Sequence, residues 1–176
     1  TYITDLLTDH AIDWLDRRDP DKPFLLYLSH KAVHAEFQPA RRHLGMYEGE
    51  KIELPATFDQ TKTGAYRDLK WPEWVASQRV SWHGVDYMYH QNTDLHQLVT
   101  RYCETLMGVD DSVGRVLDYL TSQGLDSSTL VIYMGDNGFG WGEHGLIDKS
   151  HFYEESAKVP LLVRCPELFR GGIRPD

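Results

Sequence analysis

The sequence is short of cysteine, of long apolar runs and of basic residues, and each shortage excludes a class of protein. Its two cysteines, Cys103 and Cys165, form no C-x-x-C pair, which argues against a zinc knuckle or a thioredoxin-type site. They could form one disulfide, but we favour two buried thiols. No apolar run approaches the roughly 20 residues of a membrane-spanning helix, so we expect no membrane span. The net charge of −9 disfavours nucleic acid as a partner, because binding its backbone requires clustered Lys and Arg.

The glycine-rich segment 135–145 lacks the signatures of a nucleotide-binding loop. It contains no G-x-x-x-x-G-K-[ST], since Lys149-Ser150 has no glycine before it. It also has no G-x-G-x-x-G placed to open a helix directly after a strand. We therefore expect no nucleotide site there.

The chain has enough apolar residues to bury a core. Of its 176 residues 41% are apolar, and five are Trp, which is in the range of one domain. It begins without Met and almost inside a predicted helix. We therefore expect it to be a piece of something longer.

Hydrophobic periodicity predicts two helices and two buried strands. The first helix, 4–18, has Thr4 or Asp5 as its cap and an apolar face formed by Ile3, Leu7, Ala11, Trp14 and Leu15. The continuous apolar runs 24–28 and 130–134 are typical of strands covered on both faces. The second helix, 93–123, has an apolar stripe and is expected to end at a left-handed Gly124. This alternation predicts an α/β fold with a mostly parallel sheet flanked by helices.

The segment 39–96 is less regular and is predicted to be a loop-rich insertion. Glycine and proline interrupt it, and aromatic residues lie between them. We expect these aromatics to pack the insertion onto the core. The alternative is that one or more of Trp71, Trp74 and Trp82 line a sugar-binding face.

Polar side chains follow both predicted strands. Asp136 and Asn137, bracketed by glycines, come directly after the run 130–134, where an open α/β sheet places its ligand. Their oxygens suit Ca²⁺ or Mg²⁺ better than zinc, although Asp-Asn-Gly is also a common turn. With Lys149 and His34 they would make a pocket for a tetrahedral oxyanion, sulfate or phosphate. The adjacent Asp110 and Asp111 diverge by about 100° on a helix, so we interpret them as structural.

Several separated motifs share one order with a known family. They are the Lys22–Phe37 segment, Gly135-Asp136-Asn137-Gly138, Gly142-Glu143-His144-Gly145, Lys149, Tyr153-Glu154-Glu155-Ser156 and Val159-Pro160-Leu161. Together they resemble the second half of a type I sulfatase of the alkaline phosphatase superfamily, most weakly between residues 45 and 90. The resemblance implies an alkaline-phosphatase-like fold that is incomplete here, with 1–176 as a single partial domain.

The resemblance also implies roles for individual residues. Asp136 and Asn137 would be two of the Ca²⁺ ligands, with Mg²⁺ as an alternative ion. His34 and Lys149 would contact the sulfate ester, and Lys149 would also assist at the leaving-group oxygen. The remaining residues would lie near the substrate mouth (Lys31 and His144) or behind the site (His30).

The implied activity is hydrolysis of a sulfated carbohydrate, by an enzyme of periplasmic, secreted or lysosomal location. One alternative is a phosphonate or phosphodiester hydrolase of the same superfamily, and another is a non-catalytic protein that binds metal or sulfated glycan. The family's C/S-x-P-x-R motif, whose Cys or Ser becomes the formylglycine nucleophile, is absent, as is its Gly-Lys-x-His segment. We therefore expect the nucleophile upstream, in a missing N-terminal part, and no activity from these residues alone.

Overall fold

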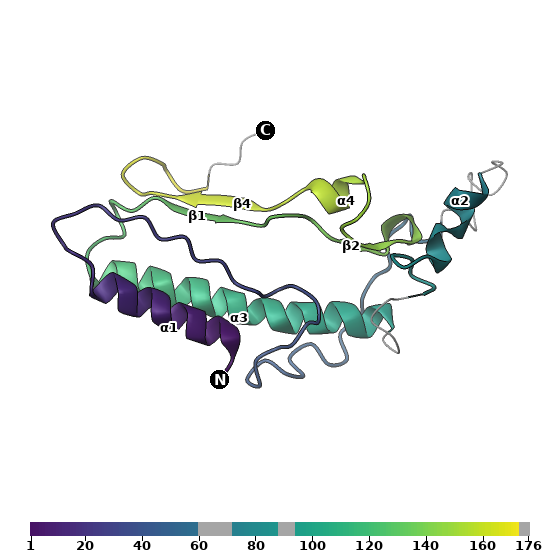
Figure 1. The fold of residues 1–176 in the computed structure, drawn as a ribbon, viewed down its shortest axis with the longest axis horizontal. Helices are drawn as coiled ribbons and strands as arrows, with labels where there is room; N and C mark the ends of the chain where they lie inside the picture. The colour runs from purple at the N-terminus through teal and green to yellow at the C-terminus, as the bar shows by residue number, and fades with distance from the viewer. Residues whose placement is uncertain (60–71, 88–93, 173–176) are drawn as a thin grey trace. The chain divides into compact units, whose positions relative to one another are not determined.

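The computed structural model describes residues 1–59, 72–87 and 94–172, which belong to two compact units. The first unit comprises Thr1–Glu48, Thr100–Ile132 and Val163–Asp176, and the second comprises Gly49–Val99 and Tyr133–Leu162. Figure 1 shows the elements in chain order: α1 (Ile3–Asp16), α2 (Glu73–Ala76), a 3₁₀ helix (Ser77–Val80), α3 (Leu95–Ser122), β1 (Val131–Met134), β2 (Gly140–Trp141), a 3₁₀ helix (Glu143–Gly145), β3 (Ile147–Asp148), α4 (Glu154–Ala157) and β4 (Leu161–Arg164). Strand β1 pairs with β4, and β2 pairs antiparallel with β3.

In the first unit, α1 lies beside α3, which belongs to this unit from Thr100 onward (Figure 1). The predicted first helix is confirmed, but its buried face is shifted, since it consists of Thr4, Thr8, Ala11 and Leu15. Ile3 and Trp14, which were expected to be buried, are 46% and 44% exposed. For Thr8 the shift has a local reason, because its hydroxyl is satisfied inside the helix: Thr8 Oγ1 donates to the Thr4 carbonyl at 2.7 Å.

The ends of the two long helices differ in how well they were predicted. Helix α1 begins after Tyr2 with no side-chain cap, so the expected Thr4 or Asp5 cap is wrong. Thr4 is buried inside the helix, and Asp5 is instead bound by Arg42 at 2.8 Å. The end of α3 is as predicted: Gly124 has φ +66°, and its N–H donates to the Thr121 carbonyl at 3.0 Å.

Of the two predicted strands, only the second is present in the structure. Residues 24–28 form no strand, and Leu25 and Tyr27 are 89% and 90% exposed. Strand β1 is confirmed, but Ile132 and Met134 are 54% and 61% exposed, so it is not covered on both faces. A continuous apolar run indicates a segment suited to burial between two layers of a fold. It does not show that elements of this chain cover both of its faces.

Buried Arg79 contacts two separate parts of the predicted insertion. Its guanidinium binds Asp86 at 3.0 and 3.1 Å and lies 4.9 Å from the centre of the Phe58 ring. Trp74 and Trp82 are 67% and 58% exposed, so the expectation that the aromatics pack onto the core is wrong for these two. Trp71 lies outside the described residues.

Both cysteines are free thiols, as we favoured. Cys165 is buried, and Cys103 is half-buried. Burial, with a smaller contribution from the Glu104 carboxylate, raises the pKa of Cys103. Within the ranges that the structure describes, no helix has the length and apolarity needed to cross a bilayer.

Candidate functional site

A short hairpin presents part of the candidate site in the second unit. Gly140 is opposite Asp148 in the pairing of β2 with β3. The turn between the strands contains Gly142, whose φ of +109° favours glycine, and its N–H donates to the Leu146 carbonyl at 2.9 Å. The same turn holds His144 at φ 57°, a left-handed conformation that is uncommon for a residue with a side chain. Strained backbone of this kind often occurs at functional sites.

Ser156, in helix α4, connects the loop after β1 with the residue after β3. Its carbonyl accepts a hydrogen bond from the Gly138 N–H at 2.9 Å, and its hydroxyl donates to the Lys149 carbonyl. Ser156 is 5% exposed, so both bonds are shielded from water. A Cβ on Gly138 would lie 2.1 Å from the Glu155 carbonyl oxygen, so the loop approaches α4 this closely only with glycine. The structure thus brings the backbones of Gly138 and Lys149 together around α4.

The predicted metal ligands follow β1 directly. Asp136 is exposed, and Asn137 is half-buried. The Asn137 amide nitrogen donates to the Gly138 carbonyl at 2.6 Å, which leaves its Oδ1 as the group for a cation. Across the described residues, no group of three or more His, Cys, Asp or Glu side chains is arranged to hold a metal. Two oxygens are of the type that Ca²⁺ prefers, but Ca²⁺ takes about 6–8, so they fit part of its coordination shell.

His144 lies in a cluster of ionisable and aromatic groups. Its ring stacks on Tyr153 with centroids 3.8 Å apart, and its Nε2 is 3.8 Å from Glu155 Oε2. Beside it, burial lowers the pKa of His151, and the carboxylate of Glu155 opposes this effect. The neighbouring Lys149 is exposed, and its backbone N–H donates to Asp148 Oδ1 at 2.7 Å. The hairpin therefore presents one lysine ammonium at the surface while its backbone is fixed.

His34 and Lys31 belong to the first unit. Both are exposed, and they share a turn in which the His34 N–H donates to the Lys31 carbonyl at 2.8 Å. His34 Nδ1 lies 2.7 Å from the Ala35 carbonyl, and because a carbonyl only accepts, Nδ1 has the proton. Its Nε2 is then the atom left for a substrate. The predicted convergence of this turn with Lys149 stays a prediction.

Sequence reasoning missed the residues that hold the site together. Ser156, Glu155 and Tyr153 were noticed only as part of a family-like motif, and no contact was predicted for them. The motif itself was the available signal. The bonds of Ser156 to Gly138 and Lys149 form only when the chain folds, so they leave no pattern of their own in the sequence. Asp148 and His83, which approach to 3.2 Å, gave no signal in the sequence.

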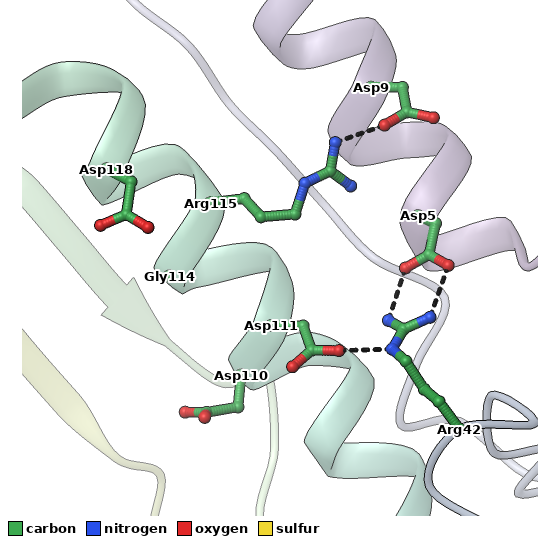
Figure 2. Close-up of a pocket in the computed structure, with 8 residues that line it drawn as sticks. All are labelled: Asp5, Asp9, Arg42, Asp110, Asp111, Gly114, Arg115 and Asp118. Atoms are coloured by element: carbon green, nitrogen blue, oxygen red, sulfur yellow. Dashed lines mark hydrogen bonds and ion pairs between the residues drawn. The ribbon is translucent and has the colours of Figure 1, made fainter. Parts of the chain in front are cut away.

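The first unit also has a hollow of about 620 Å³ (Figure 2). Its charged lining comprises two guanidinium groups and five carboxylates, from Arg42, Arg115, Asp5, Asp9, Asp110, Asp111 and Asp118. Arg42 is held between Asp5 and Asp111, and Arg115 is paired with Asp9, so both cations are already neutralised. An excess of carboxylates repels a sulfate ester, and we interpret the hollow as an ion-pair cluster between helices. Asp111 is structural, as expected.

Comparison with known proteins gives a consistent result. The family model described as Sulfatase matches residues 1–174. The N-acetylglucosamine-6-O-sulfatase of Bacteroides thetaiotaomicron is 29% identical over 220 residues, which cover 97% of this chain and 39% of that protein. A solved structure of a protein in complex with its substrate D-glucosamine-2-N,6-O-disulfate has a TM-score of 0.82 and 26% identity, covering 97% of this chain and 44% of that one.

A phosphonate monoester hydrolase of Agrobacterium radiobacter has a TM-score of 0.70 at 23% identity, covering 93% of this chain and 33% of that one. At this identity the likeness concerns the fold. The alkaline-phosphatase-like fold predicted from the sequence is therefore confirmed, and the chain is a partial domain that spans less than half the length of the proteins compared here.

Proposed function

Because this chain belongs to the sulfatase family, we propose that the protein containing it hydrolyses sulfate esters of a carbohydrate. The observation that supports this most is the family match across residues 1–174. The likeness to a protein solved with a disulfated glucosamine, together with the relative named for N-acetylglucosamine 6-sulfate, favours a 6-sulfated glucosamine as the substrate.

We assign the sulfate contacts to Lys149 and His34. The Lys149 ammonium would neutralise an anionic sulfate oxygen and the charge that develops on the leaving-group oxygen. His34 would meet the ester through Nε2, since its Nδ1 proton is held by the Ala35 carbonyl. To donate to a sulfate oxygen from Nε2, the imidazole must have both protons. Lys31 and His144 would lie at the substrate mouth.

Asp136 and Asn137 are proposed as two ligands of a Ca²⁺ ion, with Mg²⁺ as the alternative. Their oxygens fit a hard cation in type, and the Asn137 amide is oriented with its nitrogen toward the Gly138 carbonyl. Such an ion, when bound, supplies positive charge to an anionic sulfate group. The remaining ligands would come from outside this chain.

We further propose that an N-terminal part of the same domain completes the site and supplies the formylglycine. Two observations support this: the chain spans 39% of its sulfatase relative, and it has no C/S-x-P-x-R motif. Exposed apolar side chains in the first unit, Leu25, Tyr27, Leu130 and Ile132, are surfaces that such a part would cover. Peptide mapping of the natural protein tests this, because formylglycine in a C/S-x-P-x-R peptide is expected. A natural protein of only 20.4 kDa would favour the non-catalytic alternative.

Initial rates of the natural protein on three substrates test the activity. We expect hydrolysis of N-acetylglucosamine 6-sulfate and of an aryl sulfate to exceed that of an aryl phosphonate or phosphodiester. Faster hydrolysis of the phosphorus esters would favour the alternative hydrolase of the same superfamily. No turnover of any of them would favour a protein that binds metal or sulfated glycan only.

A further inference from the structure

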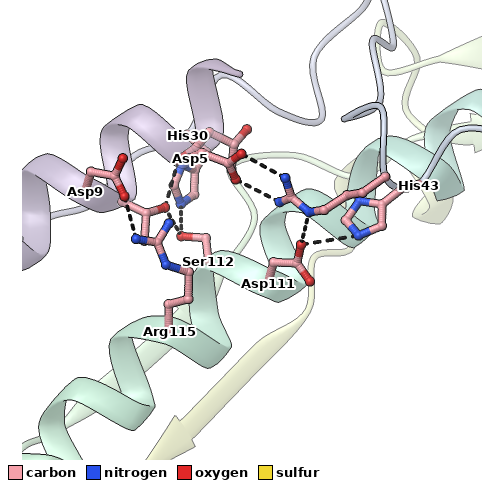
Figure 3. Close-up of polar contacts among 10 residues, drawn as sticks. Asp5, Asp9, His30, His43, Asp111, Ser112 and Arg115 are labelled. Atoms are coloured by element: carbon pink, nitrogen blue, oxygen red, sulfur yellow. Dashed lines mark hydrogen bonds and ion pairs between the residues drawn. The ribbon is translucent and has the colours of Figure 1, made fainter. Parts of the chain in front are cut away.

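A buried chain of hydrogen bonds links the turn that contains Lys31 and His34 to helix α1 (Figure 3). His30 Nε2 lies 2.8 Å from Ser112 Oγ in α3, and Ser112 Oγ lies 2.6 Å from Thr8 Oγ1 in α1. Thr8 Oγ1 lies 2.7 Å from the Thr4 carbonyl. The exposed fractions of Thr4, Thr8 and Ser112 are 0%, 0% and 2%, so the chain runs through the helix interface.

The Thr4 carbonyl, at the end of this series of hydrogen bonds, determines which group donates in each bond. The Thr4 carbonyl can only accept, so the single hydroxyl proton of Thr8 is donated to it. Ser112 must then donate to Thr8, which leaves Ser112 no proton for the histidine. The proton between Ser112 and His30 therefore belongs to His30 Nε2.

The second ring nitrogen of His30 agrees with this assignment. His30 Nδ1 is buried and has no hydrogen-bond partner among the residues that the structure describes. A proton on Nδ1 would be a buried donor without an acceptor, which is costly, and a doubly protonated ring would bury a charge there as well. Burial lowers the pKa of His30, in the direction of the neutral ring. His30 is thus a neutral imidazole with one proton, on Nε2.

We propose that His30 is a positioning residue that fixes the turn of the candidate sulfate site through its Nε2–H bond to Ser112. His30 immediately precedes Lys31, whose carbonyl accepts the His34 N–H at 2.8 Å. The side chains of Lys31 and His34 are exposed, whereas the bond of His30 to Ser112 ties the start of this turn to α3. The expected effect on kinetics rests on the proposed function, whereas the anchoring of the turn by His30 does not.

Variants in the full natural protein test the proposal. His30→Phe removes the donor but keeps a ring, whereas His30→Gln keeps an N–H close to the position of Nε2. Ser112→Ala removes the acceptor, and Ser122→Ala, which changes another serine of α3 with a bond to a helix carbonyl, is its matched control. His10→Phe, at an exposed position of α1, controls for loss of a histidine.

We expect His30→Phe and Ser112→Ala to lower kcat/KM for an aryl sulfate by roughly 10- to 100-fold, because small displacements of a binding group cost that much. His30→Gln should recover most of the loss, and both controls should match the wild type. An active wild type with an equally active His30→Phe variant would overturn the proposal, as would a Gln variant no better than Phe.

A measurement independent of activity separates this proposal from the proposed function. Histidine side-chain ¹⁵N NMR should show His30 protonated at Nε2 alone at neutral pH, and the Ser112→Ala variant should change that resonance. A proton on Nδ1 would overturn the assignment. Failure to hydrolyse any sulfate ester, with the NMR result as expected, would refute the proposed function and leave the anchoring of the turn intact.

Discussion

Ser156 holds two segments of the candidate site, one through its carbonyl and one through its hydroxyl. The carbonyl accepts from Gly138, and the hydroxyl donates to the carbonyl of Lys149. Both partners are main-chain groups, so the geometry depends on the position of α4 and on glycine at position 138, which allows the close approach. The backbone that carries the Lys149 ammonium is therefore anchored to α4.

Replacing Ser156 with Ala tests this arrangement. We expect a loss of stability of about 1 kcal/mol, because a buried hydrogen bond to a carbonyl is removed. We also expect kcat/KM for sulfate esters to fall about tenfold or more, because Lys149 is less well placed. Ser81→Ala is the matched control, since Ser81 Oγ also donates to a backbone carbonyl of the second unit but is exposed. Equal kinetics for the two variants would contradict the role of Ser156.

Two histidines should make stability depend on pH. Burial lowers the pKa of His30 and is the largest effect lowering that of His151, whereas both titrate near 6.5 when unfolded. Below about pH 6.5 the unfolded chain therefore binds more protons than the folded chain, so stability falls as pH decreases toward the lowered pKa values. The Arg42 guanidinium lowers the pKa of Asp5, which affects stability only at more acidic pH.

Thermal unfolding between pH 7.5 and 5.5 measures this effect. The unfolding midpoint should decrease on acidification, and the decrease should be smaller in a variant with both His30→Gln and His151→Gln. His10→Gln, at an exposed position, should retain the full dependence. An unchanged slope in the double variant would show that other groups are responsible.

A residue's role could be predicted where neighbouring residues in the sequence form a recognisable pattern, and not where it depends on contacts with distant segments. Asp136 and Asn137 were predicted as ligands because they follow an apolar run directly, in a pattern that the sequence displays, and their role stays a prediction. The bonds of Ser156 to Gly138 and of His30 to Ser112 join residues from different elements, and serine is common at surfaces. No local pattern distinguishes a buried, bonded serine from an exposed one.

At the scale of elements, two glycines of α3 have opposite surroundings. A Cβ on Gly108 would lie 2.8 Å from the Tyr2 ring, whereas a Cβ on Gly114 would meet no atom of the described residues within 4 Å. Gly114→Ala should therefore raise stability by about 0.5–1 kcal/mol, the usual gain for alanine over glycine in a helix. Gly108→Ala should gain less or lose stability, because the Tyr2 ring must move. Chemical denaturation measures both, and equal gains would contradict the close packing of Tyr2 on α3.

The helices were predicted better than the strands for a physical reason. Helix α3 satisfies its backbone within itself and shows its periodicity over 28 residues. A strand needs a neighbour, and a run of apolar residues does not say whether one is present. Residues 24–28 form no strand, and β1 pairs only with β4 among the described strands.

For the whole molecule, the proposal of a larger domain accounts for both the exposed apolar side chains and the family comparisons. The chain matches a sulfatase model over residues 1–174, yet spans 39% of its Bacteroides relative. If the proposed N-terminal part completes the domain, it would cover apolar side chains such as Leu25 and Tyr27. On that proposal their exposure could not be predicted from this sequence, because it would depend on residues outside it.

The most direct test of the account is the rate at which the natural protein hydrolyses N-acetylglucosamine 6-sulfate when Lys149 is replaced by Ala. We predict a fall in kcat of about 100-fold or more, because a cation that stabilises transition-state charge is lost. Lys22→Ala is the control, since Lys22 is an exposed lysine whose side chain pairs with Asp19 at 2.9 Å; it should retain wild-type activity. A Lys149→Ala enzyme as active as the Lys22→Ala enzyme would contradict the central claim that this chain contributes the sulfate-binding lysine of a sulfatase.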